Sequence, residues 1–448
     1  MELPGIPADL LSTVQDAARD CGVIRLALVG GAVRDALLHH QHQDLWRGLP
    51  DLDLVVEGSA EALAQHLLQR CGGERVSELR VHGSYGTVEL ELDGVLLDLA
   101  SARQEHYPEL AFNPVVESGP LERDLARRDF TVNALALELP LNAVAPAPPA
   151  QERLLDLHGG LAHLACRQLA FLHEASVADD PTRVIRAARY GARLGFSLAP
   201  EAAQQITDTL VVWPWSWHVG DPPEQAPPAL GTRLRMELEL LLSREPWPQA
   251  LNLLQAWGGL ELLDTGLQSD GRILRRLGQA QRLGLPLLTA LVAGAADPIA
   301  LAARLRLPLQ QQRVLQQQQR LLAWLAEVKP EQVLQWSAAD WTQALERQGL
   351  APEAAAHAVC VLAQQAADGA PWKPLLRWWG RWRHLQAAVT AKDLMAGGWK
   401  PGPALGEELR RLRWQRLEPL RCISFSSCPW PSTLAGGLLW CWCAGPLR

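Results

Sequence analysis

Two carboxylates and a double glycine near the N-terminus have the spacing of a phosphate-handling site. Asp51 and Asp53 border the apolar strand pattern 52–56, and side chains two apart on a strand point to the same face. Upstream, Gly30 and Gly31 separate an apolar strand pattern from a helix pattern with Arg34 in its first turn. Glycines let backbone N–H groups approach a phosphate closely at a helix N-terminus. Together these residues could support metal-assisted transfer of a nucleotidyl group.

A third carboxylate, Asp98, lies within the apolar run 95–100. A carboxylate in such a strand is costly unless it is paired or binds a metal. We therefore predict that Asp51, Asp53 and Asp98 are catalytic and hold two divalent cations, with Mg²⁺ as the expected ion. One ion would activate an attacking hydroxyl, and the other would stabilise a pyrophosphate leaving group. Asp51 alone could instead be a turn residue after Pro50.

Two arginines and an aspartate, Arg127-Arg128-Asp129, form a second cluster, which Asn133 follows closely. Guanidinium groups can hold triphosphate oxygens, and a carboxylate can accept a hydrogen bond from a ribose hydroxyl. We therefore predict a nucleotide-binding segment here. Taken alone, the same pattern also fits the solvated end of a helix.

A helix with an arginine at every third position is predicted to begin just after residue 180. Asp180 can cap this helix, with Pro181 in its first turn. Arg183, Arg186 and Arg189 then recur along one broad face. Such a face suits a cationic wall opposite a triphosphate, and the alternative is an exposed basic helix.

The elements that must position these residues form an α+β chain, with a mixed-sheet head followed by an all-α remainder. The periodicity predicts helices at 8–21, 32–39, 59–71 and 122–127, and strands at 24–29, 52–56, 86–92, 95–100 and 130–138. Asp93-Gly94 is typical of a two-residue hairpin turn. Residues 103–121 are predicted to be a polar loop, and 140–150 are a proline-rich break.

From residue 160 onward the pattern is almost wholly helical. The Trp- and Pro-rich stretch 212–230 interrupts it and is expected to be an inserted loop. We predict a head over 1–140, a helical neck over 141–270 with the helix after Asp180, a helical body and tail over 271–420, and an irregular segment over 421–448.

Charge is distributed unevenly along the 448 residues. The whole chain carries a net charge of −7, whereas residues 371–448 hold twelve Lys or Arg against four Asp or Glu. Tryptophans interleave these cations, and such a segment suggests a footprint for a phosphate backbone. Candidate RNA contacts there are Lys392, Lys400, Arg410 and Arg411. An ordinary amphipathic helix pair with tryptophan in its core is the alternative.

Residues 1–11 do not have the pattern of a signal peptide, and no run of about 18 apolar residues suggests a membrane span. A cytoplasmic protein with no membrane partner is therefore expected. The eight cysteines lack the spacing of a zinc site.

Taken in order, these motifs resemble the class II tRNA nucleotidyltransferase (CCA-adding enzyme) and bacterial poly(A) polymerase family. The resemblance covers residues 28–38, 51–58, 86–103, 127–136, 155–160 and 179–196, and continues more weakly at 232–238 and 398–406. Residues 171–178 lack the Ile-Gly-Asp-Pro stretch of the poly(A) polymerases. That difference favours enzymes that act on tRNA 3′ ends.

The resemblance implies a role for each motif. Gly31 and Arg34 would contact the nucleotide, and Asp51 and Asp53 would hold metal. Arg127 and Asp129 would touch phosphate and ribose. The pair formed by Asp180 and Arg183, with Arg186 and Arg189 nearby, would read the incoming base. A carboxylate accepts from the exocyclic amine of cytosine or adenine while a guanidinium donates to the neighbouring ring acceptor, so such a pair favours C and A.

The expected activity is therefore template-independent addition of C and A, from CTP and ATP, to the 3′ end of tRNA. Within the same class, the motifs leave open a CC-adding, an A-adding or a poly(A)-adding relative. A non-catalytic RNA-binding protein with the same fold is the alternative from another class, although all three carboxylates and the Asp180–Arg183 pair are present.

Overall fold

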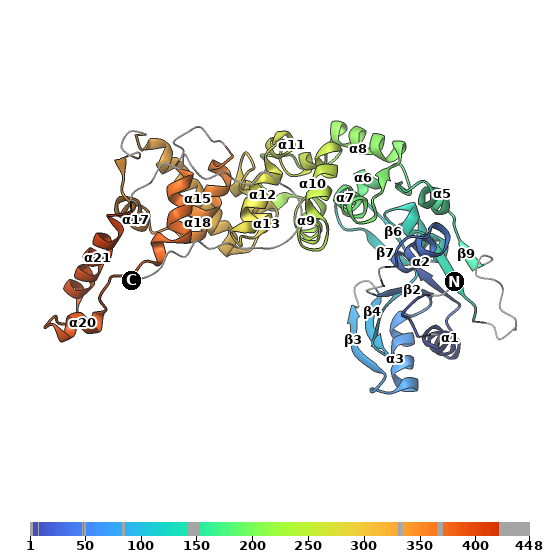
Figure 1. Ribbon diagram of the computed structural model, residues 1–448. Helices are drawn as coiled ribbons and strands as arrows, with labels where there is room; N and C mark the ends of the chain where they lie inside the picture. Colours follow the sequence, from blue (N-terminus) through green and yellow to red (C-terminus); the bar gives the residue numbers. More distant parts are fainter. Residues whose placement is uncertain are drawn as a thin grey trace.

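The computed structural model describes residues 3–420, apart from 8, 47, 49–50, 83–85, 142–152, 330–332, 334 and 365–370. Figure 1 shows an elongated, curved molecule, with the sheet-containing head at one end and the helices α20 and α21 at the other. The helices α7 and α9 lie next to the head, and α12 to α18 follow along the arch. No helix among the described residues has both the length and the apolar character that a membrane crossing requires.

The head is built on a seven-stranded sheet with the strand order β3-β4-β5-β2-β1-β8-β9. Its strands are β1 Arg25–Val29, β2 Leu52–Glu57, β3 Val76–His82, β4 Thr87–Leu92, β5 Val95–Ser101, β8 Ala136–Leu139 and β9 Leu154–Leu155. The pair β2 and β5 is parallel and the other pairs are antiparallel, so the sheet is mixed as predicted.

Alternating side chains divide this sheet into two faces. Leu52, Leu54 and Val56 of β2 are buried in the core that lies under α1 Leu10–Asp20, α2 Gly31–His42 and α3 Ala60–Cys71. Val55 faces the other way, into a smaller core with α4 Leu121–Ala126. Because Asp53 has the parity of Val55, its carboxylate lies on the α4 side of the sheet.

Three segments of the head differ from the sequence-based predictions. The supposed polar loop 103–121 contains a two-stranded antiparallel ribbon, β6 Arg103–His106 and β7 Val115–Ser118. The supposed strand 130–138 is a 3₁₀ turn at Thr131–Asn133 followed by β8. The edge strand β3 was not predicted. Its side chains are mostly exposed and polar, and the ribbon is also polar, so neither shows the apolar alternation of a half-buried strand.

The chain leaves the sheet into a helical neck and body. The helices are α5 Gly160–Ala165, α6 Ser176–Asp179, α7 Thr182–Leu194, α8 Pro200–Val212, α9 Thr232–Arg244, α10 Trp247–Ala256, α11 Thr265–Ser269, α12 Ile273–Arg282, α13 Leu287–Val292, α14 Pro298–Arg304 and α15 Leu309–Glu327. One apolar core joins Val177 to Leu315, so it crosses the predicted boundary at residue 270.

The stretch between α8 and α9 is irregular, with short 3₁₀ turns at Pro223–Gln225 and Pro228–Leu230. Its tryptophans point inward. Trp215 is buried and donates its indole N–H to the carbonyl of Ala178 at 2.8 Å, and Trp217 stacks under the guanidinium of Arg304 at 4.8 Å. The inserted segment is therefore part of the neck core and supports the chain just before Asp180.

A third core belongs to α17 Ala338–Arg347, α18 Pro352–Leu362, α19 Trp372–Gly380 and α21 Pro403–Leu417, with α20 Ala391–Ala396 beside α21. Trp378 and Trp382 are buried in it, whereas Trp399 is 40% exposed. The alternative of amphipathic helices with tryptophan in their core thus holds for part of the tryptophan-rich basic segment. The Cys- and Trp-rich segment 421–448 lies outside the described residues.

Candidate active site

The predicted carboxylates come together on one face of the head sheet. In the parallel pair β2 and β5, Asp53 lies directly opposite Asp98, and opposed residues in a ladder point to the same side. Asp51 lies just before β2, and its charge contributes to the raised pKa of both Asp53 and Asp98. This face is the one that α4 covers only in part, and it is where the cavities described below open.

Burial and mutual repulsion raise the pKa values of the carboxyl groups of Asp53 and Asp98. Burial, followed by the charges of Asp53 and Asp51, raises the pKa of Asp98 to about 6. Burial and the charge of Asp51 also raise the pKa of Asp53, while the guanidinium of Arg128 acts in the opposite direction. A nearby cation would relieve this cost, because it favours the ionised forms.

The carboxylates suit a hard cation, although they do not form a complete ligand set. Within the described part of the chain, no three His, Cys, Asp or Glu side chains are gathered closely enough to hold a metal alone. The site for two divalent cations expected at Asp51, Asp53 and Asp98 therefore remains a prediction. Mg²⁺ is commonly held by one or two carboxylates together with substrate phosphates. The oxygen Oδ1 of Asp98 is buried without a hydrogen-bond partner, so the donor set fits.

The double glycine brings the backbone against this acidic face. Gly30 has a φ of +66°, and a Cβ at this position would stand 2.9 Å from Oδ2 of Asp53. A side chain is therefore excluded by both conformation and space. Gly31 begins α2, and both glycines line the large cavity beside Asp53.

That cavity has a volume of about 590 Å³ and lies between the head and the neck. Its walls come from β2, the β6–β7 ribbon, the 127–133 segment, α7 and α9. The residues that line it are Gly30, Gly31, Asp53, Arg103, Glu105, Tyr107, Asn113, Pro114, Arg127, Arg128, Asp129, Asn133, Asp180, Thr182, Arg183, Arg186, Tyr190, Arg233, Met236 and Glu237. Most of the predicted nucleotide-binding residues are thus brought to one hollow.

Arg34, which was predicted to bind the nucleotide, is held by neighbouring side chains. Its side chain is buried, its Nε bonds Asp35 at 2.7 Å and its Nη1 bonds Oδ1 of Asn133 at 2.7 Å. It lies 5.4 Å from the ring centre of Tyr190 and does not line the cavity. Arg34 therefore supports Asn133 and Tyr190. Its Nη2 would stand 3.6 Å from a Cβ at Gly31, which lines the cavity, and the nucleotide contact predicted for Arg34 remains a prediction.

Arg127 and Arg128 are both anchored by Asp124, a fully buried carboxylate at the end of α4. Arg127 donates to Oδ1 of Asp124 at 2.7 and 2.9 Å and to Glu105 at 3.1 Å, and Arg128 donates to Oδ2 of Asp124 at 3.0 Å. The two guanidinium charges hold the pKa of Asp124 below its usual range, against the effect of burial. Both arginines are therefore fixed at the edge of the cavity.

Asp129 has no free oxygen for a ribose in this structure. Its Oδ1 accepts from the backbone N–H of Phe130 at 2.8 Å and from Asn133 at 3.0 Å. Its Oδ2 accepts two hydrogen bonds from Arg186, at 2.6 and 2.8 Å. The predicted ribose contact would require one of these bonds to be exchanged. The position of Asp129 favours a role in orienting Arg186.

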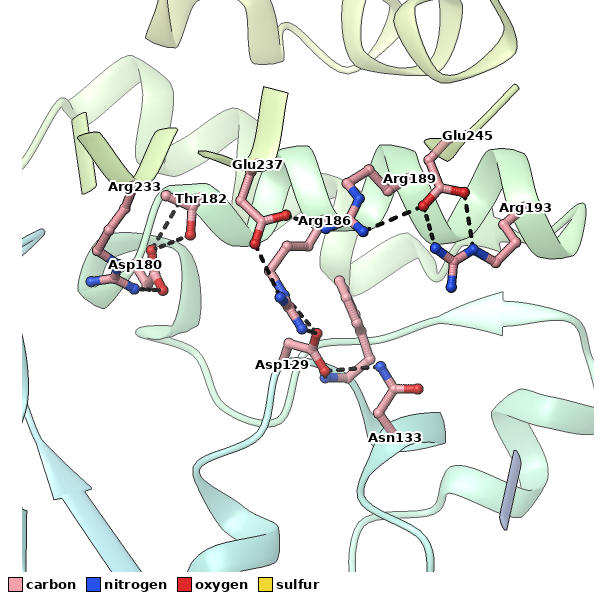
Figure 2. A network of polar contacts seen from close by, with 11 residues as sticks. Asp129, Asn133, Asp180, Thr182, Arg186, Arg189, Arg193, Arg233, Glu237 and Glu245 are labelled. Carbon is pink, nitrogen blue, oxygen red and sulfur yellow. Dashed lines mark hydrogen bonds and ion pairs between the residues drawn. The ribbon is translucent and has the colours of Figure 1, made fainter. Parts of the chain in front are cut away.

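The predicted base-reading pair is present at one end of the cavity. Oδ1 of Asp180 accepts from the hydroxyl of Thr182 at 2.6 Å, and Oδ2 accepts from Arg233 (Figure 2). Arg183 donates to the carbonyl of Arg127 at 3.1 Å. The side chains of Asp180 and Arg183 are therefore held in place before any base is bound.

The three arginines of α7 do not form a single wall. Arg183 and Arg186 line the cavity, whereas Arg189 is buried between Glu237 and Glu245 (Figure 2). Glu245 also binds Arg193. The expectation that Arg189 faces the triphosphate is thus corrected. Its position on α7 points it toward α9, where the acidic partners neutralise it.

Several lining residues were missed by sequence reasoning. Arg233 and Glu237 are four apart on α9, and their segment carried only a weak resemblance. Glu105 lies in β6 and Tyr107 directly follows that strand, in the segment that was interpreted as a loop. Tyr190, one position after Arg189, lies within 6 Å of the guanidinium groups of Arg34, Arg186 and Arg193. The i, i+4 spacing of Arg233 and Glu237 was the one signal in the sequence that could have indicated these two residues, because it places both on one side of a helix.

The candidate RNA contacts of the tail lie far from the cavity, on α20, α21 and the connection between them. Lys392, Lys400, Arg410 and Arg411 are all exposed. Arg411 is paired with Glu408 at 2.6 and 2.7 Å. That these exposed cations bind RNA remains a prediction.

A glycine turn against acidic strands, with an arginine-lined cavity above them, defines a nucleotidyltransferase as the class of protein. Residues 26–170 match the poly A polymerase head domain. The chain is 39% identical over 302 residues to a CC-adding tRNA nucleotidyltransferase of Deinococcus radiodurans, covering 66% of this chain and 70% of that protein.

An A-adding tRNA nucleotidyltransferase of Aquifex aeolicus is 33% identical over 256 residues, which are 57% of this chain and 27% of that protein. The structure of a CCA-adding enzyme in its apo form aligns with a TM-score of 0.67 and 21% identity, over 92% of this chain and 93% of the other. The chain belongs to the family of tRNA nucleotidyltransferases with a poly(A) polymerase head. The predicted family and the α+β class are confirmed.

Proposed function

We propose that this protein is a template-independent nucleotidyltransferase that adds C, A or both to the 3′ end of tRNA from CTP and ATP and releases pyrophosphate. The observation that carries this proposal is the direct opposition of Asp53 and Asp98 on the sheet face below an arginine-lined cavity. A non-catalytic RNA-binding protein would have no need for mutually repelling carboxylates at such a position, because their burial is costly.

Mg²⁺ is the proposed cofactor. Asp53 and Asp98, with Asp51 beside them, would hold it, and when bound it supplies charge neutralisation at the reacting phosphate and lowers the pKa of a coordinated hydroxyl. In the reaction, the 3′-oxygen of the RNA bonds to the α-phosphorus of the nucleotide, and the bond from that phosphorus to the pyrophosphate oxygen breaks.

The residues of the chain contribute mainly position and charge. Arg127 and Arg128, fixed by Asp124, place positive charge at the edge of the cavity nearest Asp53. Arg186 adds a further cation, which Asp129 and Glu237 orient. Preorganised donors of this kind stabilise a triphosphate and the charge that develops on the leaving group without reorganisation during the reaction.

Base selection is assigned to Asp180 and Arg183. The carboxylate of Asp180 can accept from the amine of cytosine or adenine, and Arg183 can donate to the neighbouring ring acceptor. Guanine and uracil present the opposite polarity to such a pair. No nucleic-acid template is then needed for the preference for C and A.

The extent of addition is a separate question. Addition of CC alone is favoured by the 39% identity to the Deinococcus radiodurans relative, while the Aquifex aeolicus relative is named for A addition. Full CCA addition and poly(A) addition complete the set of alternatives.

The experiment that decides among them uses tRNA transcripts that end before CCA, after CC, or in an unrelated sequence. Each transcript is incubated with labelled CTP and ATP, singly and together, with and without Mg²⁺. We expect Mg²⁺-dependent extension of the tRNA ends and none of the unrelated RNA. Extension in a chelator would contradict the metal assignment, and untemplated runs of A on unrelated RNA would identify a poly(A)-adding enzyme.

The matched variants are Asp53→Ala and Glu61→Ala. Asp53→Ala should abolish nucleotide addition while tRNA affinity stays within a few-fold, because the carboxylate lies in the head and not on the basic tail. Glu61 is exposed on α3, and its loss should leave turnover unchanged. Unchanged turnover in Asp53→Ala would refute the proposed site.

A further inference from the structure

A second cavity, of about 250 Å³, opens on the same acidic face of the head sheet. It shares Asp53, Arg127 and Arg128 with the nucleotide cavity, and its own walls include Asp98 and Glu89. The two hollows therefore meet at Asp53, with the paired arginines between them. The assignment made above places the nucleotide in the larger hollow and Mg²⁺ at Asp53 and Asp98, and it leaves the rest of the smaller hollow without an occupant.

The strand register explains how the smaller cavity is built. Asp53 of β2 opposes Asp98 of β5, Asp98 opposes Glu89 of β4, and Glu89 opposes Arg80 of β3. Opposed residues share a face, so these side chains form one row across four strands. Glu89 extends the acidic row away from the nucleotide cavity, toward the exposed edge of the sheet.

A histidine and an arginine border the outer end of this row. Nε2 of His82 lies 3.8 Å from Oε2 of Glu89, and Nη1 of Arg80 lies 4.0 Å from the same oxygen. Thr87, opposite His82 on the neighbouring strand, lines the cavity as well. The glutamate side chain is 39% exposed, so it is accessible to a ligand.

Transfer of a nucleotidyl group needs two substrates, one on each side of the α-phosphate, because the attacking and leaving oxygens stand in line. We propose that the smaller cavity holds the 3′-terminal ribonucleoside of the RNA, and that Glu89 accepts a hydrogen bond from its 2′-hydroxyl. This inference rests on the proposed function. It adds a binding site for the second substrate and a residue that reads the sugar.

The chemistry of the site favours a ribose over other ligands of the same size. Arg127 and Arg128 line both cavities, whereas the part of the wall around Asp98 and Glu89 is acidic. That part disfavours a phosphate group, and a ribose offers hydroxyl donors to its carboxylates. The 2′-hydroxyl is the group by which a protein distinguishes RNA from DNA at a given position. A site built around Glu89 would thus select ribonucleotide ends.

The test compares two otherwise identical tRNA substrates, one ending in a ribose and the other in a 2′-deoxyribose that keeps its 3′-hydroxyl. For the wild-type protein we expect kcat/KM to be about tenfold or more higher with the ribose end, since a charged hydrogen bond is lost with the deoxyribose. Glu89→Ala should lose most of this preference by lowering kcat/KM for the ribose end alone. Glu89→Gln, which keeps a carbonyl oxygen, should retain part of it.

Glu91→Ala is the matched control, because Glu91 lies two residues along the same strand and face but does not line the cavity. It should keep the wild-type preference. A wild-type preference that survives in Glu89→Ala, or equal use of both ends by the wild type, would overturn the inference. A shift in the Mg²⁺ concentration for half-maximal rate, with the sugar preference intact, would also overturn it and make Glu89 a metal ligand.

These outcomes are separate from a failure of the proposed function. If the wild-type protein extends neither substrate, the activity itself is refuted. If it extends both and Glu89 has no effect on the preference, only the assignment of the second cavity is refuted.

Discussion

Asp180 is restrained on both of its oxygens, and this restraint decides how it can meet a base. Thr182 binds one oxygen and Arg233 binds the other, so the carboxylate cannot rotate freely. Oδ1 already accepts from both the backbone N–H and the hydroxyl of Thr182, so the lone pair left to meet a base is on Oδ2. A fixed acceptor beside the fixed guanidinium of Arg183 is the geometry that selection by hydrogen-bond polarity requires.

At the residue scale, we predict that Asp180→Ala loses discrimination among the four nucleotides. A good two-point contact to a base contributes about 1–3 kcal/mol of discrimination, so the preference for C and A should fall by roughly tenfold or more. The measurement is kcat/KM for CTP, ATP, GTP and UTP on one tRNA substrate.

Asp208→Ala is the control for this prediction, since Asp208 is exposed on α8 and bonds only Gln204 among the described contacts. It should keep the wild-type order of nucleotides. A retained preference for C and A in Asp180→Ala would show that the base is read elsewhere.

At the scale of elements, the helices α7 and α9 are joined by alternating charges and not by apolar contacts alone. Glu237 of α9 binds both Arg186 and Arg189 of α7, and Glu245 binds Arg189 and Arg193 (Figure 2). Buried ion pairs of this kind are costly to break by removing one partner. They explain why only part of the basic face of α7 is available to a substrate.

The end of α4 is the second element on which the site depends. We predict that Asp124→Ala lowers the free energy of unfolding by about 3–5 kcal/mol, because two arginines lose a buried partner, and raises KM for CTP and ATP. Glu122→Ala, in the same helix but about half exposed and paired with Arg25, should cost under about 1 kcal/mol. Chemical denaturation and steady-state kinetics check both effects.

The pH dependence of this effect has a definite sign. The pKa of Asp124 is lowered in the folded protein, so its contribution is present above the unfolded value and is lost as pH falls through the folded one. The stability difference between wild type and Asp124→Ala should therefore be largest near neutral pH and shrink below pH 3.8, the ordinary value for the group. A difference that is constant from pH 7 to pH 3 would contradict the ionic role.

At the scale of the whole molecule, the cavity and the exposed cations of the tail lie at opposite regions of a curved chain (Figure 1). An RNA that reaches both must be recognised over a distance by its shape and backbone. We predict that the combined substitution Lys392→Ala, Lys400→Ala and Arg410→Ala weakens tRNA binding at low salt. It should also lower the slope of log affinity against log salt by about 2–3, one per lost phosphate contact.

Arg411→Ala is the control for the tail, because Arg411 is already paired with Glu408. Its effect on the salt slope should be smaller than that of Lys392, Lys400 or Arg410. Identical slopes for the wild type and the triple variant would place the RNA-binding surface elsewhere.

Much of the head could be predicted because its local patterns are unambiguous. The strands β1, β2, β4 and β5 carry clear apolar alternation or runs, and the glycines mark the turn into α2. The ribbon β6–β7 could not be predicted, since its pairing joins polar residues such as Gln104 and Glu117. Nor could the position of the tryptophan-rich insert, whose contacts with Ala178 and Arg304 join distant parts of the chain.

By itself, the sequence determined the chemical types at the site and their local geometry. The two-residue period places Asp51 and Asp53 on one face, and the glycines demand a close backbone approach, whatever the rest of the chain does. Only the tertiary structure decided which charges are free. It set Asp98 opposite Asp53, bound Asp129 to Arg186, and buried Arg34 and Arg189 among partners. Local periodicity acts over a few residues, whereas the pairs Asp53–Asp98, Asp129–Arg186 and Arg34–Asn133 are 45, 57 and 99 positions apart and depend on the path of the whole chain.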